Sequence, residues 1–132
     1  MKGPGKFAHL RLVAIMGGAG VSHFVAPHVY EPIIPKPLRG QGRFLVYASG
    51  VAELACAGLL LSSRTRRAGA WLSFATILGV YPANIQAVLD GGMHHAKPLM
   101  NTRAAAIIRL PFQLPMLWDA LRLARAPGAS AP

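Results

Sequence analysis

The chain of 132 residues contains four apolar stretches, each close to or above the roughly 20 residues that a helix needs to cross a lipid bilayer. These stretches are Phe7–Ala26, Phe44–Ser62, Ala68–Leu89 and Ala104–Leu123. Only 14% of the residues are charged, whereas soluble domains carry about 25%, so little chain remains for a soluble domain. The sequence predicts one all-α domain over residues 1–125, a four-helix, multi-pass transmembrane bundle. Residues 126–132 are Ala, Pro, Gly and Ser, which predicts a disordered tail.

The first apolar stretch resembles a secretory signal peptide at its start. Lys2, Lys6 and Arg11 precede an apolar core, and the glycines between residues 17 and 20 resemble a cleavage region. However, the apolar character continues to Ala26, which is longer than a signal-peptide core. We therefore predict an uncleaved membrane helix.

The connection between the first and second stretches, Pro27–Arg43, has an unusual composition. Its four prolines exclude a continuous helix, yet it contains too many Val, Ile and Leu residues for a solvated linker. We predict a proline-rich capping loop that folds over one end of the bundle, with Tyr30 at the membrane interface.

The formal net charge of +10 could indicate a nucleic-acid partner. The basic residues instead cluster at the ends of the apolar stretches, where they contact lipid headgroups and set orientation, so we predict no nucleic-acid binding. One side of the predicted membrane takes Lys2, Lys6, Arg11, Arg64, Arg66, Arg67, Arg122 and Arg125. The other takes Lys36, Arg39, Arg43, Lys97 and Arg103. The excess on the first side predicts that both termini are cytoplasmic.

Among the polar residues within the apolar stretches, five are candidates for a buried polar core: His23, Glu53, Asn84, Arg109 and Gln113. Such side chains are costly in hydrocarbon and rarely face lipid, so each marks a packing or functional site. Counting about 1.5 Å per residue from the outer end of each stretch places all five in one half of the membrane. Most of them share a helix face with small residues, which indicates close helix approach. The sequence therefore predicts a polar core inside an apolar shell.

Two interpretations of this polar core stay open. Glu53 and Arg109 form either a buried structural ion pair or a ligand site, in which Arg109 holds an anion or a quinone carbonyl. His23 is either a packing residue or a proton relay, and Asn84 and Gln113 are either interhelical hydrogen-bonding residues or ligand contacts. The candidate ligand-binding residues are His23, Tyr30, Asn84, Arg109 and Gln113.

Metal and thiol chemistry find little support in the sequence. His94 and His95 follow Met93, but adjacent histidines point in different directions and no third ligand is evident, so we predict no metal site. Cys56 is the only cysteine, which excludes an intrachain disulfide.

The motifs that hold these polar residues are similar to those of the DoxX-like family of small bacterial integral membrane proteins. In chain order the matching segments are GVSHF at 20–24 with PHVYEPIIP at 27–35, YASGVAE at 47–53, VYPANI at 80–85, and RLPFQ at 109–113. The resemblance covers about residues 10 to 122. It implies a four-helix bundle in the bacterial inner membrane, and it implies that His23, Tyr30, Glu53, Asn84, Arg109 and Gln113 are recurring polar positions. It also implies association with redox systems, with quinone as the cofactor it suggests.

Three functions are consistent with the sequence. The leading hypothesis is a non-catalytic accessory protein that binds a membrane partner or forms a homo-oligomer, and we expect no enzymatic activity from the isolated chain. The second is a quinone- or small-oxyanion-binding subunit of a membrane oxidoreductase. The third is lipid or small-molecule transport, which needs an oligomer because four helices barely form a pore.

Overall fold

The computed structural model describes residues 4–93, 98, 99 and 101–127, and the described part of the chain consists of helices joined by turns, without strands. Four long helices make up most of it: α1 (Ala8–Val25), α3 (Gly42–Leu61), α4 (Arg66–Leu89) and α5 (Arg103–Arg125). One short helix and two 3₁₀ turns join α1 to α3: α2 (Pro27–Tyr30), η1 (Glu31–Ile33) and η2 (Lys36–Gln41). The helix bounds lie within three residues of the predicted stretches.

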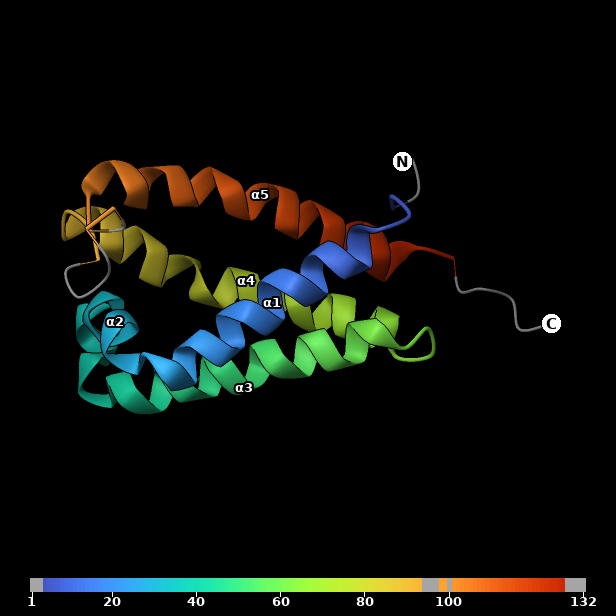
Figure 1. Cartoon of the computed structure of the whole chain (residues 1–132), viewed down its shortest axis with the longest axis horizontal. Coiled ribbons are helices and arrows are strands. Elements are labelled where there is room, and N and C mark those ends of the chain that lie inside the picture. The colour runs from blue at the N-terminus through green and yellow to red at the C-terminus, as the bar shows by residue number, and fades with distance from the viewer. Residues whose placement is uncertain (1–3, 94–97, 100, 128–132) are drawn as a thin grey trace.

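The four long helices run side by side along the molecule, with α1 crossing the others at an angle (Figure 1). Contacts connect α1 with α3, α3 with α4, α4 with α5, and α5 with α1, the last pair packing least extensively. The helices therefore form a ring in which α3 and α5 occupy opposite corners. This order could not be read from the sequence, and it determines which polar side chains meet.

Three of the long helices are apolar enough to cross a membrane by length and composition: α1, α4, and α3 together with the turn that precedes it. The helix α5 forms as predicted, but its hydropathy is too low for it to count among these candidate spans. The prediction of a fourth apolar span is therefore not confirmed. The sequence of α5 contains Arg109, Gln113 and Asp119 together with two prolines, and these residues lower its mean hydropathy. All three polar side chains are at least partly buried, so the polarity of α5 lies on the inward side of the helix.

Glycines allow α1 and α3 to approach closely. A methyl group added at Gly20 would lie 3.1 Å from the Gly50 carbonyl oxygen and 2.8 Å from the Leu54 side chain. A methyl group added at Gly50 would lie 3.0 Å from Cβ of His23 and 3.2 Å from the Gly20 carbonyl oxygen. Small residues at such crossings are typical of membrane helices, since they let backbones touch. The crossing places His23 directly against α3.

The connection between α1 and α3 folds over one end of the bundle, as predicted for a capping loop (Figure 1). Prolines at the first turns of α2, η1 and η2 divide it into short pieces, because proline lacks a backbone N–H and fits best at the start of a helix. Arg39 donates to the Pro32 carbonyl oxygen at 2.9 Å and lies 3.7 Å from the Asp90 carboxylate. Arg43 pairs with Glu31. These contacts fasten the loop to itself and to the end of α4.

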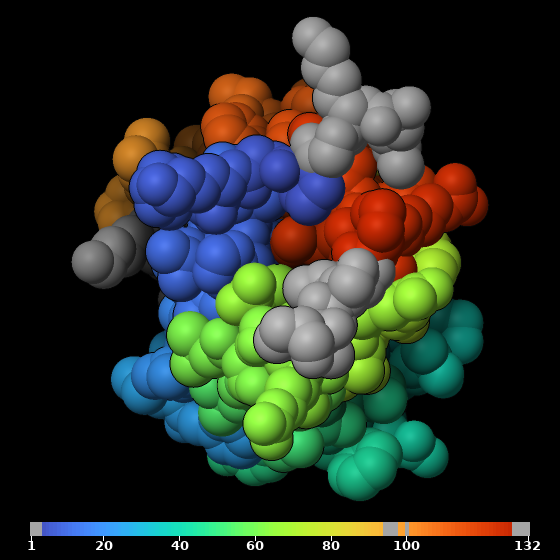
Figure 2. All heavy atoms as spheres, turned by 90° about the vertical axis from the view of Figure 1, so that its right-hand side faces the viewer, coloured from blue at the N-terminus to red at the C-terminus, as the bar shows by residue number. Residues whose placement is uncertain are grey.

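The opposite end of the bundle carries the start of α1, the α3–α4 turn and the end of α5, which face the viewer together in Figure 2. An ion pair joins α1 to α5 there, with Arg11 Nη2 2.8 Å from Asp119 Oδ2. Arg66 closes the α3–α4 turn by donating to the carbonyl oxygen of Leu60 at 3.0 Å. The basic residues of this end among the described part are Lys6, Arg11, Arg64, Arg66, Arg67, Arg122 and Arg125.

Candidate functional site

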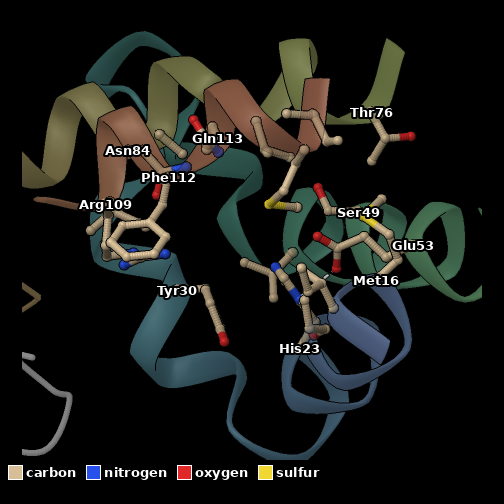
Figure 3. A pocket seen from close by; sticks show the side chains of 18 of the residues that line it. Met16, His23, Tyr30, Ser49, Glu53, Thr76, Asn84, Arg109, Phe112 and Gln113 are labelled. Atoms are coloured by element: carbon tan, nitrogen blue, oxygen red, sulfur yellow. Dashed lines mark hydrogen bonds and ion pairs between the residues drawn. The ribbon is translucent and has the colours of Figure 1, made fainter. Parts of the chain in front are cut away.

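A cavity of about 240 Å³ lies between the four long helices, near the end that the capping loop covers (Figure 3). An engineered apolar cavity of about 150 Å³ holds benzene, so this one has room for a larger ring-sized molecule. All the polar positions singled out from the sequence line it: His23, Tyr30, Glu53, Asn84, Arg109 and Gln113. The predicted polar core therefore exists in the structure as the lining of one cavity.

The polar groups of the cavity form two clusters (Figure 3). Asn84 of α4 and Arg109 and Gln113 of α5 gather on one side. His23 of α1 and Glu53 of α3 gather on the other, beside Ser49. Apolar side chains such as Met16 and Ile77 complete the lining. The cavity is thus a mainly apolar space with a polar cluster on either side, which is the usual composition of a small-molecule site.

The ion pair predicted between Glu53 and Arg109 is not among the ion pairs of the described residues. Glu53 Oε2 instead lies 2.9 Å from Nδ1 of His23, with both side chains almost fully buried. The physical reason is the helix order: Gly20 and Gly50 bring α1 against α3, whereas Arg109 lies on the opposite corner of the ring. The prediction from opposite charge alone therefore gave the wrong partner for Glu53.

The hydrogen bond of His23 leaves the Glu53 carboxylate only partly satisfied. His23 Nδ1 lies 2.6 Å from the carbonyl oxygen of Ala19, and this contact has hydrogen-bond geometry. One N–H donates well to one acceptor, so Glu53 Oε2 stays without a hydrogen-bond donor among the described residues despite its closeness to Nδ1. The two atoms attract electrostatically when the imidazole is protonated.

Gln113 contributes a second unsatisfied oxygen. Its side chain is 8% exposed, and its Oε1 atom has no hydrogen-bond donor within the part of the chain described. A buried acceptor without a donor costs about 1–3 kcal/mol unless water or a ligand supplies one. Two such acceptors, from different helices, therefore border the same cavity.

Arg109 supplies positive charge to the same space. Its side chain is half-buried, and its guanidinium contacts the sulfur of Met93 rather than a carboxylate of any described residue. A guanidinium carries five N–H donors in a planar fork that fits carboxylate, phosphate or carbonyl oxygen. Among the described residues only the Met93 sulfur accepts a hydrogen bond from this fork, so most of its donors can serve a molecule in the cavity.

Tyr30, predicted at the membrane interface, turns its side chain toward the helices that line the cavity. Its ring stacks on His23 with centroids 4.1 Å apart, and its hydroxyl lies 2.6 Å from Ser22 Oγ. Because Ser22 already donates to the Ala19 carbonyl oxygen, the tyrosine hydroxyl is the donor of this bond. The short turns of the capping loop direct Tyr30 inward, where it closes the cavity beside His23.

We expect Tyr30→Phe to lower the free energy of unfolding by about 0.5–1.5 kcal/mol, since it removes the hydrogen bond to Ser22 but keeps the ring on His23. Tyr30→Ala should cost clearly more, because the stacked ring is lost as well. Equilibrium unfolding in detergent micelles measures both losses. Equal losses for the two variants would contradict a role of the stacked ring.

Some lining residues gave no signal in the sequence. Met16 and Phe112 are apolar residues within apolar stretches, so nothing distinguishes them from lipid-facing neighbours. Ser49 and Thr76 share helix faces with Glu53 and Asn84, a pattern that identifies them once the cavity is known. The pair His94 and His95 lies outside the described residues, as do residues 128–132 of the predicted tail.

Neither the curated proteins nor the solved structures contain a match to the chain. Residues 12–124, which extend from the first long helix into the last, match the model of one family. On this match the chain belongs to the family described as Domain of unknown function (DUF8561).

Proposed function

We propose that this protein is an integral membrane protein that binds a small oxygen-bearing molecule, a quinone headgroup or a small oxyanion, in the cavity between its helices. One observation carries the proposal: the half-buried guanidinium of Arg109 borders a ring-sized cavity and has no carboxylate partner among residues 4–93, 98, 99 and 101–127. A buried charge without a counter-ion is unfavourable, so an oxygen-rich ligand stabilises it.

The neighbours of Arg109 support the same ligand chemistry. Asn84 and Gln113 lie beside it and are each more than nine-tenths buried, and their amide N–H groups can donate to a second oxygen of the ligand (Figure 3). Met16 and Ile77 offer apolar contact to the ligand body. A quinone ring or an aromatic carboxylate combines these features.

The side of the bundle between α1 and α5 is the natural entrance. Ile15 on α1 and Phe112 on α5 both line the cavity, yet they are 43% and 67% exposed. The cavity therefore approaches the apolar surface where these two helices pack least extensively. A ligand that dissolves in the bilayer would enter here without crossing water.

Within this proposal α5 is the fourth membrane span. Its 23 residues extend over about 35 Å, which exceeds the roughly 30 Å of hydrocarbon. Its exposed residues include Ile107, Ile108 and Leu114, whereas Arg109 and Gln113 line the cavity. The middle of the helix is thus apolar on its exposed side and polar toward the cavity.

The distribution of basic residues supports an orientation in the membrane, and the family resemblance supports a type of membrane. The arginine-rich end holds the start of α1 and the end of α5, so we place both termini in the cytoplasm. The DoxX-like resemblance favours the bacterial inner membrane. We further propose a non-catalytic role, in which the chain holds the ligand as an accessory subunit of a membrane redox complex.

Binding to the purified protein in lipid nanodiscs tests the proposed function. Benzoate serves as the oxyanion and a short-chain ubiquinone analogue as the quinone. We expect at least one of them to bind with 1:1 stoichiometry and to raise the thermal unfolding midpoint, because a ligand that binds only the folded state stabilises it. Absence of binding and of any thermal shift for both molecules would contradict the proposal.

A further inference from the structure

Besides hydrogen-bond donors for an anion, the cavity contains a buried acceptor that lacks a donor among the described residues. This acceptor, Glu53 Oε2, lies across the cavity from Arg109. A plain oxyanion or a fully oxidised quinone carries acceptors only, so it can satisfy Arg109 but not this oxygen. The polar lining is therefore incomplete for a ligand of that kind.

We infer that the ligand is an organic acid that also carries a hydroxyl or amino group, with its anionic end at Arg109 and its donor at Glu53. This inference rests on the proposed function and narrows its ligand class. The carboxylate of Glu53 accepts the donor hydrogen, and the amides of Gln113 and Asn84 lie beside the anionic end. The molecule thus bridges the two polar clusters of the cavity.

The helix arrangement fits a bridging ligand of one ring. Glu53 and Arg109 lie on α3 and α5, which occupy opposite corners of the ring of helices. Neighbouring helix axes lie about 8–10 Å apart, so opposite axes lie about 11–14 Å apart, and the side chains take up part of this distance. Figure 3 shows the two polar clusters separated across the cavity, with Tyr30 beside them. A single aromatic ring carrying a carboxylate and a hydroxyl spans such a gap.

Because Glu53 is buried, the cavity should favour ligands that carry a hydrogen-bond donor over ligands that lack one. The side chain of Glu53 is 7% exposed, so bulk water does not solvate it freely. His23, its ion-pair partner among the described residues, directs its Nδ1 hydrogen to the Ala19 carbonyl oxygen. A ligand with a methyl ether instead of a hydroxyl would leave Oε2 buried without a donor. Such a ligand should bind much more weakly, because an unpaired buried acceptor costs free energy.

A series of benzoates in nanodiscs tests the inference. The probes are benzoate, meta- and para-hydroxybenzoate, the matching methoxybenzoates, and ortho-hydroxybenzoate, whose hydroxyl is occupied by its own carboxylate. We expect meta- or para-hydroxybenzoate to bind about 10- to 100-fold more tightly than benzoate and than its methoxy counterpart. The ortho isomer should bind like benzoate.

Substitution of Glu53 then locates the preference. Glu53→Gln should reduce the ratio of the hydroxybenzoate affinity to the benzoate affinity by about tenfold or more, because a charged acceptor binds a hydroxyl more strongly than a neutral one. Glu31→Gln is the matched control, since Glu31 pairs with Arg43 in the capping loop outside the cavity. The Glu31→Gln variant should prefer hydroxybenzoate over benzoate by the same factor as the unmodified protein.

The outcomes separate this inference from the proposed function. If benzoate binds as tightly as both hydroxybenzoates, the inference is wrong while the proposed function stands. A hydroxyl preference that survives Glu53→Gln also overturns the inference, because the donor then contacts another group. If no benzoate binds to the unmodified protein, the inference fails for this ligand class, and the quinone measurement decides the proposed function. The ligand series uses only the unmodified protein, so a folding defect in the variant cannot obscure its result.

Discussion

Replacing Arg109 by glutamine is expected to weaken benzoate binding by about 100-fold, which corresponds to about 2.7 kcal/mol of binding free energy. Among the described lining residues the guanidinium is the one cationic group on its side of the cavity, and charge-assisted hydrogen bonds to it contribute most of the affinity for an anion. The fold should persist, since Arg109 makes no ion pair with a described residue. Isothermal titration calorimetry in nanodiscs measures the change.

Arg103→Gln is the matched control for this substitution. Arg103 lies at the start of the same helix, is exposed, and does not line the cavity, so benzoate affinity should stay within about twofold. Equal affinity in the Arg109 variant and the unmodified protein would show that the anion binds elsewhere. An equal loss in both variants would indicate a nonspecific effect of surface charge.

Replacing Gly50 by leucine is expected to destabilise the bundle by about 3 kcal/mol or more, because the new side chain must enter a contact that has no space for a methyl group. A Cβ atom at Gly50 would lie 3.0 Å from Cβ of His23 and 3.2 Å from the Gly20 carbonyl oxygen. The helices α1 and α3 would have to separate, which also removes His23 from Glu53. Unfolding in detergent measures the loss.

Gly58→Leu separates packing from helix propensity. Gly58 lies on the same helix, and a Cβ atom there would meet no heavy atom within 4 Å. Both substitutions gain about 0.8 kcal/mol of helix propensity, so their difference reports the contact between the helices. A Gly50→Leu variant as stable as the Gly58→Leu variant would contradict the close approach of α1 and α3.

The sequence predicted the bounds of the long helices better than it predicted which helices pack against each other. Hydrophobic length located each long helix to within three residues, because every backbone group must be satisfied within a spanning segment. It could not give the order of the helices around the bundle, which depends on contacts far apart in the chain. Glu53 was therefore assigned to Arg109 by charge, whereas Gly20 and Gly50 place it beside His23.

The lining of the cavity was only partly predictable, for a similar reason. Buried polar residues in apolar stretches are costly, so their inward position followed from physics alone. The stacking of Tyr30 on His23 could not be predicted, because the turns that direct its ring inward depend on how three proline-started pieces fold together. Apolar residues such as Phe112 differ from lipid-facing ones only in where their helix points. Sequence thus identified the polar half of the lining and not the apolar half.

The central claim is that the polar side chains face a common interior rather than lipid. Nuclear magnetic resonance in micelles that contain a lipid spin-labelled near its chain terminus tests this claim directly. Gln113 and Asn84 are 8% and 7% exposed, whereas their chain neighbours Leu114 and Ile85 are 58% and 43% exposed. We expect the spin label to broaden the Leu114 and Ile85 methyl signals strongly and to leave the two side-chain amides sharp. Equal broadening of the amides and the neighbouring methyl groups would contradict the cavity and every proposal that depends on it.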